Sequence, residues 1–380
     1  MPTLPAAGSR PIVMTEIEQF GGAERSIVAL SRWLYQRNLP NHLVTYIDHC
    51  NLAQYATHPM QVIELRPAPG ARKKIAALRH YFQHQPRDAH KPLLSGYQPA
   101  LHATIAGIRG FHTLMHDTPS LFGDLDVRST RAKVRVAISN RIIGYGLRTG
   151  GNTIVTSEYL RSECRKDFNV EAKIVRMGGL SPASTLTQTG TSTARFLPVS
   201  NRQLRLFSVC RIEANKRIDW MIRSLAELER GQTPLSSRVD WQLDLAGKGS
   251  LIPSLQEMAN HLGIGNRIHF HGFVSDDDLE QLFARTHLLL MPAVQGYGIP
   301  AIESLQRGIP VLLHRESGVS DILLDTPWAT VLTNGEAQMT AALQSAIDGV
   351  LEEKHHAVAQ PQLPTEDSWA EQVARLCGWL

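Results

Sequence analysis

Short apolar runs alternate with longer amphipathic segments along most of the chain. The runs have the length and composition of buried strands, and helical patterns with apolar positions three and four residues apart lie between most of them. In the first half the predicted strands are 11–16, 42–47, 61–65, 111–117, 152–157 and 172–178. In the second half they are 204–210, 241–247, 268–274, 287–293 and 309–313.

This alternation predicts an α/β protein with two doubly wound, Rossmann-like domains, each a parallel sheet covered by helices on both faces. The pattern stops at 181–203, which is rich in Ser, Thr and Pro and has no apolar period, so we interpret it as a linker. We therefore expect domains at 1–180 and 204–363, facing each other across a ligand-binding cleft. The amphipathic helix predicted in 364–380 is expected to pack back towards the first domain.

Composition is that of an ordinary globular protein, with 43% hydrophobic and 19% charged residues. The four cysteines are far apart and no apolar run approaches the roughly 18 residues of a membrane span, so we expect a cytoplasmic protein. Charge is uneven: residues 1–180 hold 23 Lys and Arg against 13 acidic residues, and the remainder holds 16 against 22. Either the first half meets an anionic partner or its basic surface only aids solubility.

The stretch AVQGYGIPAIESLQRGIPVL, from Ala293 to Leu312, predicts a glycine loop that opens a helix. Gly296 and Gly298 allow tight turns, and Pro300 suits the first position of a helix. Backbone N–H groups at such an end bind anions well. Glu303, one turn in, would either accept hydrogen bonds from ligand hydroxyls or only complement the helix dipole, and the stretch alone favours neither.

Other loops that follow strands carry candidate binding groups. Arg211 and Lys216 stand five residues apart after a strand, and together they suit a diphosphate. Gly21 and Gly22 open the first helix, where a tight turn is the alternative interpretation. His116 and Asp117 end a strand, which is the usual place for functional side chains in a parallel sheet.

Two basic amphipathic segments account for the charge of the first half. Segment 70–85 places Ile75, Leu78 and Phe82 on one face with cations elsewhere, and 127–148 holds six cations and no acid. Either could lie on an anionic membrane surface. For 127–148 we favour a helix that is half core and half solvated.

Taken together, the motifs GGAER, the strand-end His-Asp, SVCRIEANK, LAGKGS, IHFHGFV and GYGIPAIESLQRGIPVL resemble a known family. The chain is similar to the retaining nucleotide-sugar glycosyltransferases of the large family four, which have the B-type fold of two Rossmann-like domains (GT-B). The resemblance covers most of the chain and is strongest from 204 to 325. It implies transfer of a sugar, as in hexosyltransferases, from a nucleotide-diphosphate donor to a hydroxyl acceptor, with no metal and no cofactor.

The resemblance also implies roles for individual residues. Arg211 and Lys216 match the pair that holds the donor diphosphate, and Glu303 matches the acid that binds the ribose. His116 matches a strand-end histidine near the reacting carbon. The remaining donor-binding positions implied in this way are Gly21, Gly22, Phe273, Val274, Gly296, Tyr297, Gly298 and Ile299.

One position departs from the family pattern: Gln295 stands where the family has its first Glu, eight residues before Glu303. Glutamine still hydrogen-bonds a sugar hydroxyl but carries no charge. The alternative function is therefore a catalytically weakened, sugar-nucleotide-binding partner subunit. An epimerase or phosphorylase would need an acid–base pair that we do not find, and the glycine pattern is incomplete for an NAD oxidoreductase. We expect a saccharide, lipid-linked or small-molecule acceptor and no nucleic acid, and we leave open a peripheral contact with the inner face of the membrane.

Overall fold

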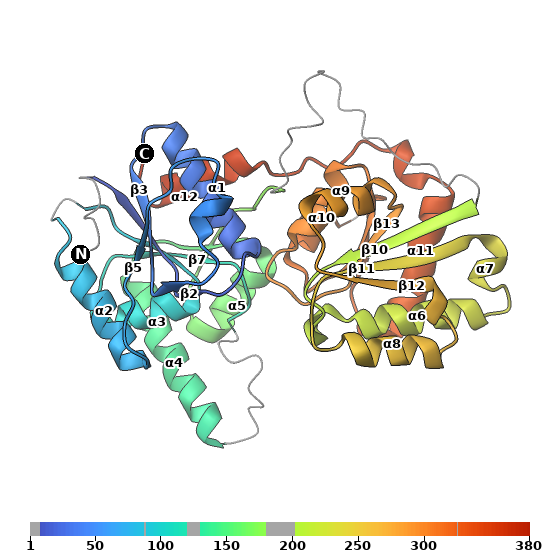
Figure 1. Ribbon diagram of the computed structural model, residues 1–380, viewed down its shortest axis with the longest axis horizontal. Helices are drawn as coiled ribbons and strands as arrows, with labels where there is room; N and C mark the ends of the chain where they lie inside the picture. Colours follow the sequence, from blue (N-terminus) through green and yellow to red (C-terminus); the bar gives the residue numbers. More distant parts are fainter. Residues whose placement is uncertain (1–7, 87–88, 120–129, 180–201, 325) are drawn as a thin grey trace. The chain divides into compact units, whose positions relative to one another are not determined.

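The computed structural model describes residues 8–86, 89–119, 130–179, 202–324 and 326–380 (Figure 1). The chain divides into domain 1, residues 1–180 with 364–380, and domain 2, residues 181–363. Most of the predicted linker, 181–201, lies outside the described residues. The first described strand of domain 2 begins at Gln203.

Domain 1 is built on a seven-stranded sheet of order β5-β3-β1-β6-β7-β8-β9, in which every strand pair is parallel. Its strands are β1 Arg10–Val13, β3 Asn41–Thr45, β5 Val62–Glu64, β6 Leu93–Ser95, β7 His112–Met115, β8 Thr153–Val155 and β9 Lys173–Ile174. A small sheet pairs β2 Glu16–Ile17 with β4 Ile47–Asp48. Its helices are α1 Gly22–Gln36, η1 Leu52–Tyr55, α2 Ala71–Gln83, α3 Tyr97–Ala106, α4 Thr130–Thr149, α5 Glu158–Phe168 and α12 Glu366–Leu376.

The last helix of the chain belongs to domain 1. In α12 the side chains of Trp369 and Val373 are buried, and the helix packs against α1. Two further contacts join the C-terminal residues to this domain: Arg10 Nη2 donates to the Trp379 carbonyl (2.8 Å), and Asn152 Nδ2 donates to the Leu376 carbonyl (2.6 Å). Domain 1 is therefore completed by a segment that follows the whole of domain 2 in the sequence.

Domain 2 holds a six-stranded parallel sheet of order β12-β11-β10-β13-β14-β15. Its strands are β10 Gln203–Val209, β11 Asp240–Ala246, β12 Ile268–Gly272, β13 Leu288–Met291, β14 Val311–His314 and β15 Ala329–Leu332. Its longer helices are α6 Ile218–Arg230, α7 Leu235–Arg238, α8 Ile252–His261, α9 Asp276–Ala284, α10 Ile299–Gln306 and α11 Met339–Leu351. Short helical turns are η4 Ala214–Lys216, η5 Gly265–Arg267, η6 Gly318–Ile322, η7 Glu336–Gln338 and η8 Lys354–Ala357.

Helices cover both faces of the second sheet. Helices α6, α8 and α11 form one layer, and α9 and α10 lie on the other face (Figure 1). Because both faces are covered, the central strands carry buried apolar side chains: Leu206 pairs with Leu243 on one side and Leu288 on the other, and all three are buried. The prediction of two Rossmann-like α/β domains is confirmed.

Strands β6 and β15 were missed in the sequence, although β6 lies at the centre of its sheet. Each is only three or four residues long, and β6 follows Pro92 directly. Such short apolar runs have no length over which a period can be recognised.

Candidate functional site

The candidate site lies where the second sheet reverses its strand order. From β10 the chain moves outward to β11 and β12 and then returns to the other side of β10 as β13. The carboxyl ends of the strands at such a reversal are where ligands of doubly wound sheets usually bind. Lys216 belongs to the loop after β10, and Gln295 belongs to the loop after β13.

A directional chain of hydrogen bonds joins these loops. The Lys216 ammonium donates to Gln295 Oε1 (3.0 Å), Gln295 Nε2 donates to Ser317 Oγ (2.9 Å), and Ser317 Oγ donates to the Tyr297 carbonyl (3.2 Å). Gln295 and Ser317 each accept one hydrogen bond and donate the next, and the series begins at the charged Lys216 and ends at the Tyr297 carbonyl. The loops after β10, β13 and β14 are thus held together around one ammonium group.

Gly298 occupies a position that only glycine fits. Its φ of 114° lies in the left-handed region. An added Cβ would stand 2.7 Å from Gln295 Nε2 and 3.0 Å from Ser317 Oγ, within the chain just described. The residue directly precedes α10, whose first position is Ile299; Pro300 is therefore the second helical residue and not the first.

Glu303 lies in the interior of α10 and is only 6% exposed. A carboxylate that served only the helix dipole would be expected to remain in water, because burying its charge is costly. Burial therefore weighs against the purely electrostatic interpretation. Beyond it, Gly308 adopts a φ of 75° directly after the helix end at Arg307, as is common for a glycine that ends a helix.

Arg211 follows β10 as predicted but is placed differently from Lys216. Its side chain is 61% exposed and lies 3.2 Å from Glu213 Oε1 on the same loop. The ion pair is solvent-exposed and therefore weak. The guanidinium can exchange this partner for a ligand phosphate at small cost.

Phe273 is the most exposed aromatic side chain reported for the described residues, at 74%. It follows β12, and the Lys248 ammonium from the neighbouring β11 loop lies 5.2 Å from its ring centre. A ring in water with a cation beside it offers a flat apolar surface of the kind on which planar bases stack. Val274, the other predicted residue here, is partly exposed.

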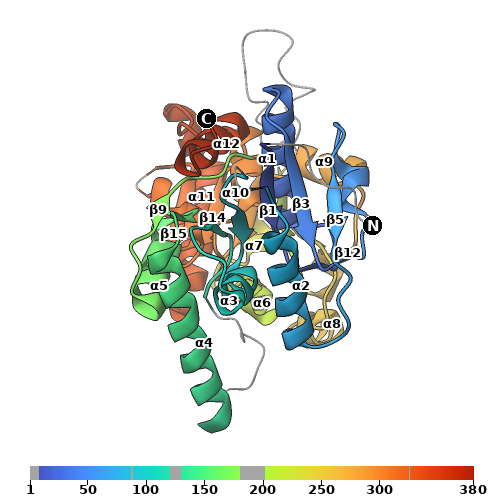
Figure 2. The ribbon, with the colours of Figure 1, turned by 90° about the vertical axis from the view of Figure 1, so that its left-hand side faces the viewer.

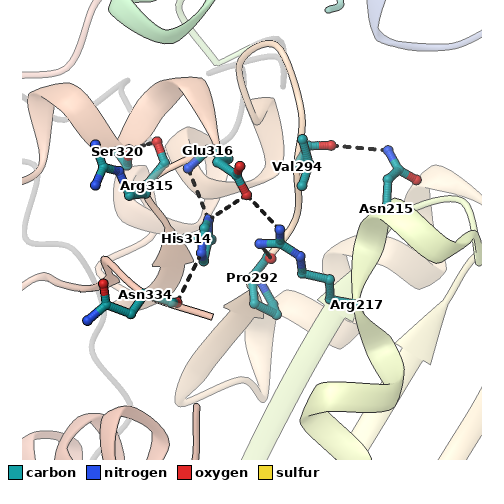
Figure 3. A network of polar contacts seen from close by, with 9 residues as sticks. All are labelled: Asn215, Arg217, Pro292, Val294, His314, Arg315, Glu316, Ser320 and Asn334. Carbon is teal, nitrogen blue, oxygen red and sulfur yellow. Dashed lines mark hydrogen bonds and ion pairs between the residues drawn. The ribbon is translucent and has the colours of Figure 1, made fainter. Parts of the chain in front are cut away.

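Figure 3 shows an ion pair that ties the loops after β10, β13 and β14 together. Arg217 Nη2 lies 2.6 Å from Glu316 Oε2, and Arg217 Nη1 donates to the Pro292 carbonyl (3.3 Å). Arg217 has a φ of 54°, a left-handed conformation unusual for arginine, and its guanidinium lies 4.3 Å from the Trp220 ring centre. The interactions that hold Arg217 compensate for its backbone strain.

The imidazole of His314 holds the loop that carries Glu316. Its Nε2 donates to the Asn334 carbonyl (3.2 Å), while its Nδ1 accepts from the Glu316 N–H (3.1 Å). Burial, and then the charge of Arg217, lower the pKa of His314, against the opposing effect of Glu316. The ring is therefore neutral near pH 7 and fixes the start of the loop through both nitrogens.

Domain 1 presents its own predicted residues at the carboxyl ends of β1 and β7. Gly21 caps α1, and its N–H donates to Glu24 Oε2 (3.0 Å); Gly22 is the first residue of the helix. His116 directly follows β7, and burial lowers its pKa to about 4, against the opposing charge of Asp117. Its buried Nε2 has no hydrogen-bond partner within the described parts of the chain. Such a neutral nitrogen is available to a ligand hydroxyl.

Sequence reasoning missed Ser317, Glu316 and Arg217. Ser317 and Glu316 follow β14 at the same edge as Gln295, so the rule that function gathers at strand ends could have found them. Arg217 gave no signal, because its left-handed backbone is visible only in the structure. Among the described residues, no group of three or more His, Cys, Asp or Glu is placed to hold a metal ion.

Two parallel α/β domains with polar loops gathered at the strand ends define the GT-B class of fold. Solved structures agree: the chain superposes on Anabaena HepE in complex with UDP-glucose with a TM-score of 0.70 and 16% identity, covering 98% of this chain and 100% of that one. At this identity the likeness establishes the fold alone.

Residues 193–360, which are somewhat less than half of the chain, match the family model described as glycosyl transferases group 1. The resemblance recognised in the sequence is thereby confirmed. A GDP-mannose-dependent α-(1-6)-phosphatidylinositol monomannoside mannosyltransferase of Mycolicibacterium smegmatis is 26% identical over 63% of this chain and 66% of its own length. An uncharacterized glycosyltransferase of Methanocaldococcus jannaschii is 24% identical over 45% of this chain and 44% of its own length. The chain thus matches less than two thirds of either relative.

Proposed function

We propose that the chain is a retaining glycosyltransferase that moves a sugar from a nucleotide-diphosphate-sugar donor to a hydroxyl acceptor. The observation that carries this proposal is the Lys216–Gln295–Ser317 chain at the reversal of the second sheet, in a domain of the group 1 glycosyl transferases. An acceptor in polysaccharide, glycolipid or other glycoconjugate synthesis fits the relatives, one of which is named for a phosphatidylinositol mannoside.

In this proposal Lys216 and Arg211 neutralise the diphosphate as it leaves, aided by backbone N–H groups of Gly296 to Ile299. Glu303 binds the ribose hydroxyls, and Phe273 and Val274 lie beside the base. Gly21 and Gly22 let the donor approach domain 1, and His116 binds near the reacting carbon. The leaving phosphate accepts the proton of the acceptor hydroxyl on the same face, so neither a protein nucleophile, a metal nor a cofactor takes part.

Gln295 is the observation that favours a second candidate, a partner subunit that binds sugar nucleotides without efficient turnover. An uncharged amide at this position does not stabilise a developing positive centre as a carboxylate would. Donor binding would then persist while transfer and donor hydrolysis would be absent.

The test combines a thermal-shift screen with product analysis. UDP-glucose and GDP-mannose are the first donors to try, because they are named for a structural neighbour and a relative. A true donor at 100 times its Kd adds about 2.7 kcal/mol to the free energy of unfolding. Stabilisation with slow release of free sugar supports the enzyme, stabilisation without it supports the partner subunit, and no stabilisation by any nucleotide sugar contradicts both.

A further inference from the structure

Helix α4 extends beyond the rest of domain 1 at its Thr130 end, as Figures 1 and 2 both show. Its C-terminal half is anchored firmly. Ile143 and Leu147 are buried, and Arg148 Nη1 donates to the Phe168 carbonyl (2.6 Å). Gly146 lies so close to α3 that an added Cβ would collide with Thr104 Oγ1.

The opposite face of the same helix carries a line of exposed apolar side chains. Val134, Ile138 and Tyr145 are 52%, 56% and 50% exposed. At about 100° per residue they fall within about 40° of one another around the axis and stand opposite the buried pair Ile143 and Leu147. We call these three residues the α4 stripe. From the sequence we expected this face only to be solvated. The structure differs in that the face carries exposed apolar side chains.

Cations surround the α4 stripe. Arg131, Lys133, Arg135 and Arg141 are exposed on the helix, and Thr130–Thr149 contains no acidic residue. Arg131 and Arg135 lie on one side of the stripe and Arg141 on the other. An apolar line bordered by positive charge is complementary to a surface that has a negatively charged outer layer and an apolar interior.

The other basic segment lacks such a face. In α2, Leu78 is fully buried, Lys74 pairs with Glu16 (2.7 Å), and Arg79 Nε donates to the Ala106 carbonyl (2.8 Å). Its exposed cations Arg72 and Lys73 have no line of exposed apolar side chains beside them. Of the two segments, α4 has the combination that an interfacial helix needs.

We propose that α4 docks domain 1 on an anionic lipid bilayer, with the α4 stripe entering the boundary between headgroups and acyl chains. Charge complementarity selects this occupant: a run of cations on one helix with no acid among them favours a continuous negative surface. None of the helices in the described parts of the chain is long and apolar enough to cross a membrane. The proposal does not depend on the donor site.

The test measures co-sedimentation of the full chain with vesicles. We expect binding to phosphatidylcholine vesicles that contain phosphatidylglycerol, little binding to phosphatidylcholine alone, and weaker binding as salt is raised. The variant V134S/I138S/Y145S and the variant R131E/R141E should each lower the fraction bound at least about tenfold. The matched control R72E/K73E, which changes exposed cations of α2, should retain binding close to wild type.

A second measurement tests the same proposal without using the variant V134S/I138S/Y145S. A polarity-sensitive fluorophore on I138C should shift to the blue with anionic vesicles, while the same label on N260C in domain 2 should not. Absent wild-type binding or equal binding to neutral vesicles would overturn the proposal. A drop in Tm of the triple variant would also overturn it, because it would mean that another part of this chain covers the α4 stripe. Loss of a dimer in the triple variant would overturn it as well, because the stripe would then be covered by a second copy of the chain.

Discussion

The Lys216 ammonium donates its hydrogen bond to the amide oxygen of Gln295, 79 positions away in the sequence, at the point where the second sheet reverses. An amide can accept from Lys216 and donate to Ser317 at the same time, whereas a carboxylate can only accept. Gln295 thus links Lys216 to Ser317 through the two ends of one amide. The residue that departs from the family pattern is fully integrated in this site.

Replacing Lys216 with Ala should lower kcat/KM for the donor about tenfold to a hundredfold, because a hydrogen bond to a charged group contributes about 1.5–3 kcal/mol. Isothermal titration with UDP and steady-state kinetics would measure the effect. Lys354→Ala is the matched control, since that lysine pairs with Glu352 away from the site. Unchanged donor binding in the Lys216 variant would remove this residue from the diphosphate site.

The substitution Gln295→Glu distinguishes the two interpretations of this position. A carboxylate would pair with Lys216, lose the donation to Ser317 and bring negative charge towards the diphosphate, so we expect weaker donor binding and lower turnover. Donor KM and kcat measured separately would show both effects. A rise in kcat instead would mean that Gln295 marks a weakened catalytic site.

Gly298→Ala should destabilise domain 2 by about 1–3 kcal/mol, because alanine is strained at this φ and its Cβ would displace Gln295 and Ser317. Urea unfolding followed by circular dichroism measures this change. Gly335→Ala provides the control: its φ is −68° and no atom lies within 4 Å of an added Cβ. Equal midpoints for the two variants would contradict the packing seen around Gly298.

Stability should fall with acid because of buried histidines such as His42. Its Nδ1 lies 2.7 Å from Ser9 Oγ and its Nε2 lies 2.7 Å from Tyr81 Oη, and burial lowers its pKa to about 4. The unfolded chain, with a histidine pKa of about 6.5, binds this proton more readily. The free energy of unfolding therefore drops as the pH falls from about 6.5 towards 4, by up to about 3 kcal/mol for this group, and is constant above that window.

Urea titrations at several pH values would test this dependence. His42→Gln removes the titrating group and should flatten the pH profile in the acid range, while His261→Gln, at an exposed position on α8, should leave the profile unchanged. A profile for the His42 variant as steep as that of the wild type would exclude His42 as a source of acid sensitivity.

Local sequence determined much of this protein. Alternating apolar and amphipathic segments predicted two parallel sheets, because strands covered on both faces are mostly apolar along their length. Ser275 caps the start of α9, where its Oγ accepts from the Asp278 N–H (3.2 Å), and such capping depends only on residues a few positions apart. The motifs also pointed to the loops that follow the strands of domain 2.

Only the tertiary structure decided which of these loop residues meet and which helix face stays in water. Strand order brings Lys216 to Gln295 and Ser317, and a local pattern carries no information on strand order. Periodicity likewise showed that α2 and α4 were amphipathic, but which apolar positions are covered depends on the neighbouring helices. The core covers Leu78 in α2 and leaves Ile138 in α4 exposed, because burial is a property of the assembled domain and not of the segment.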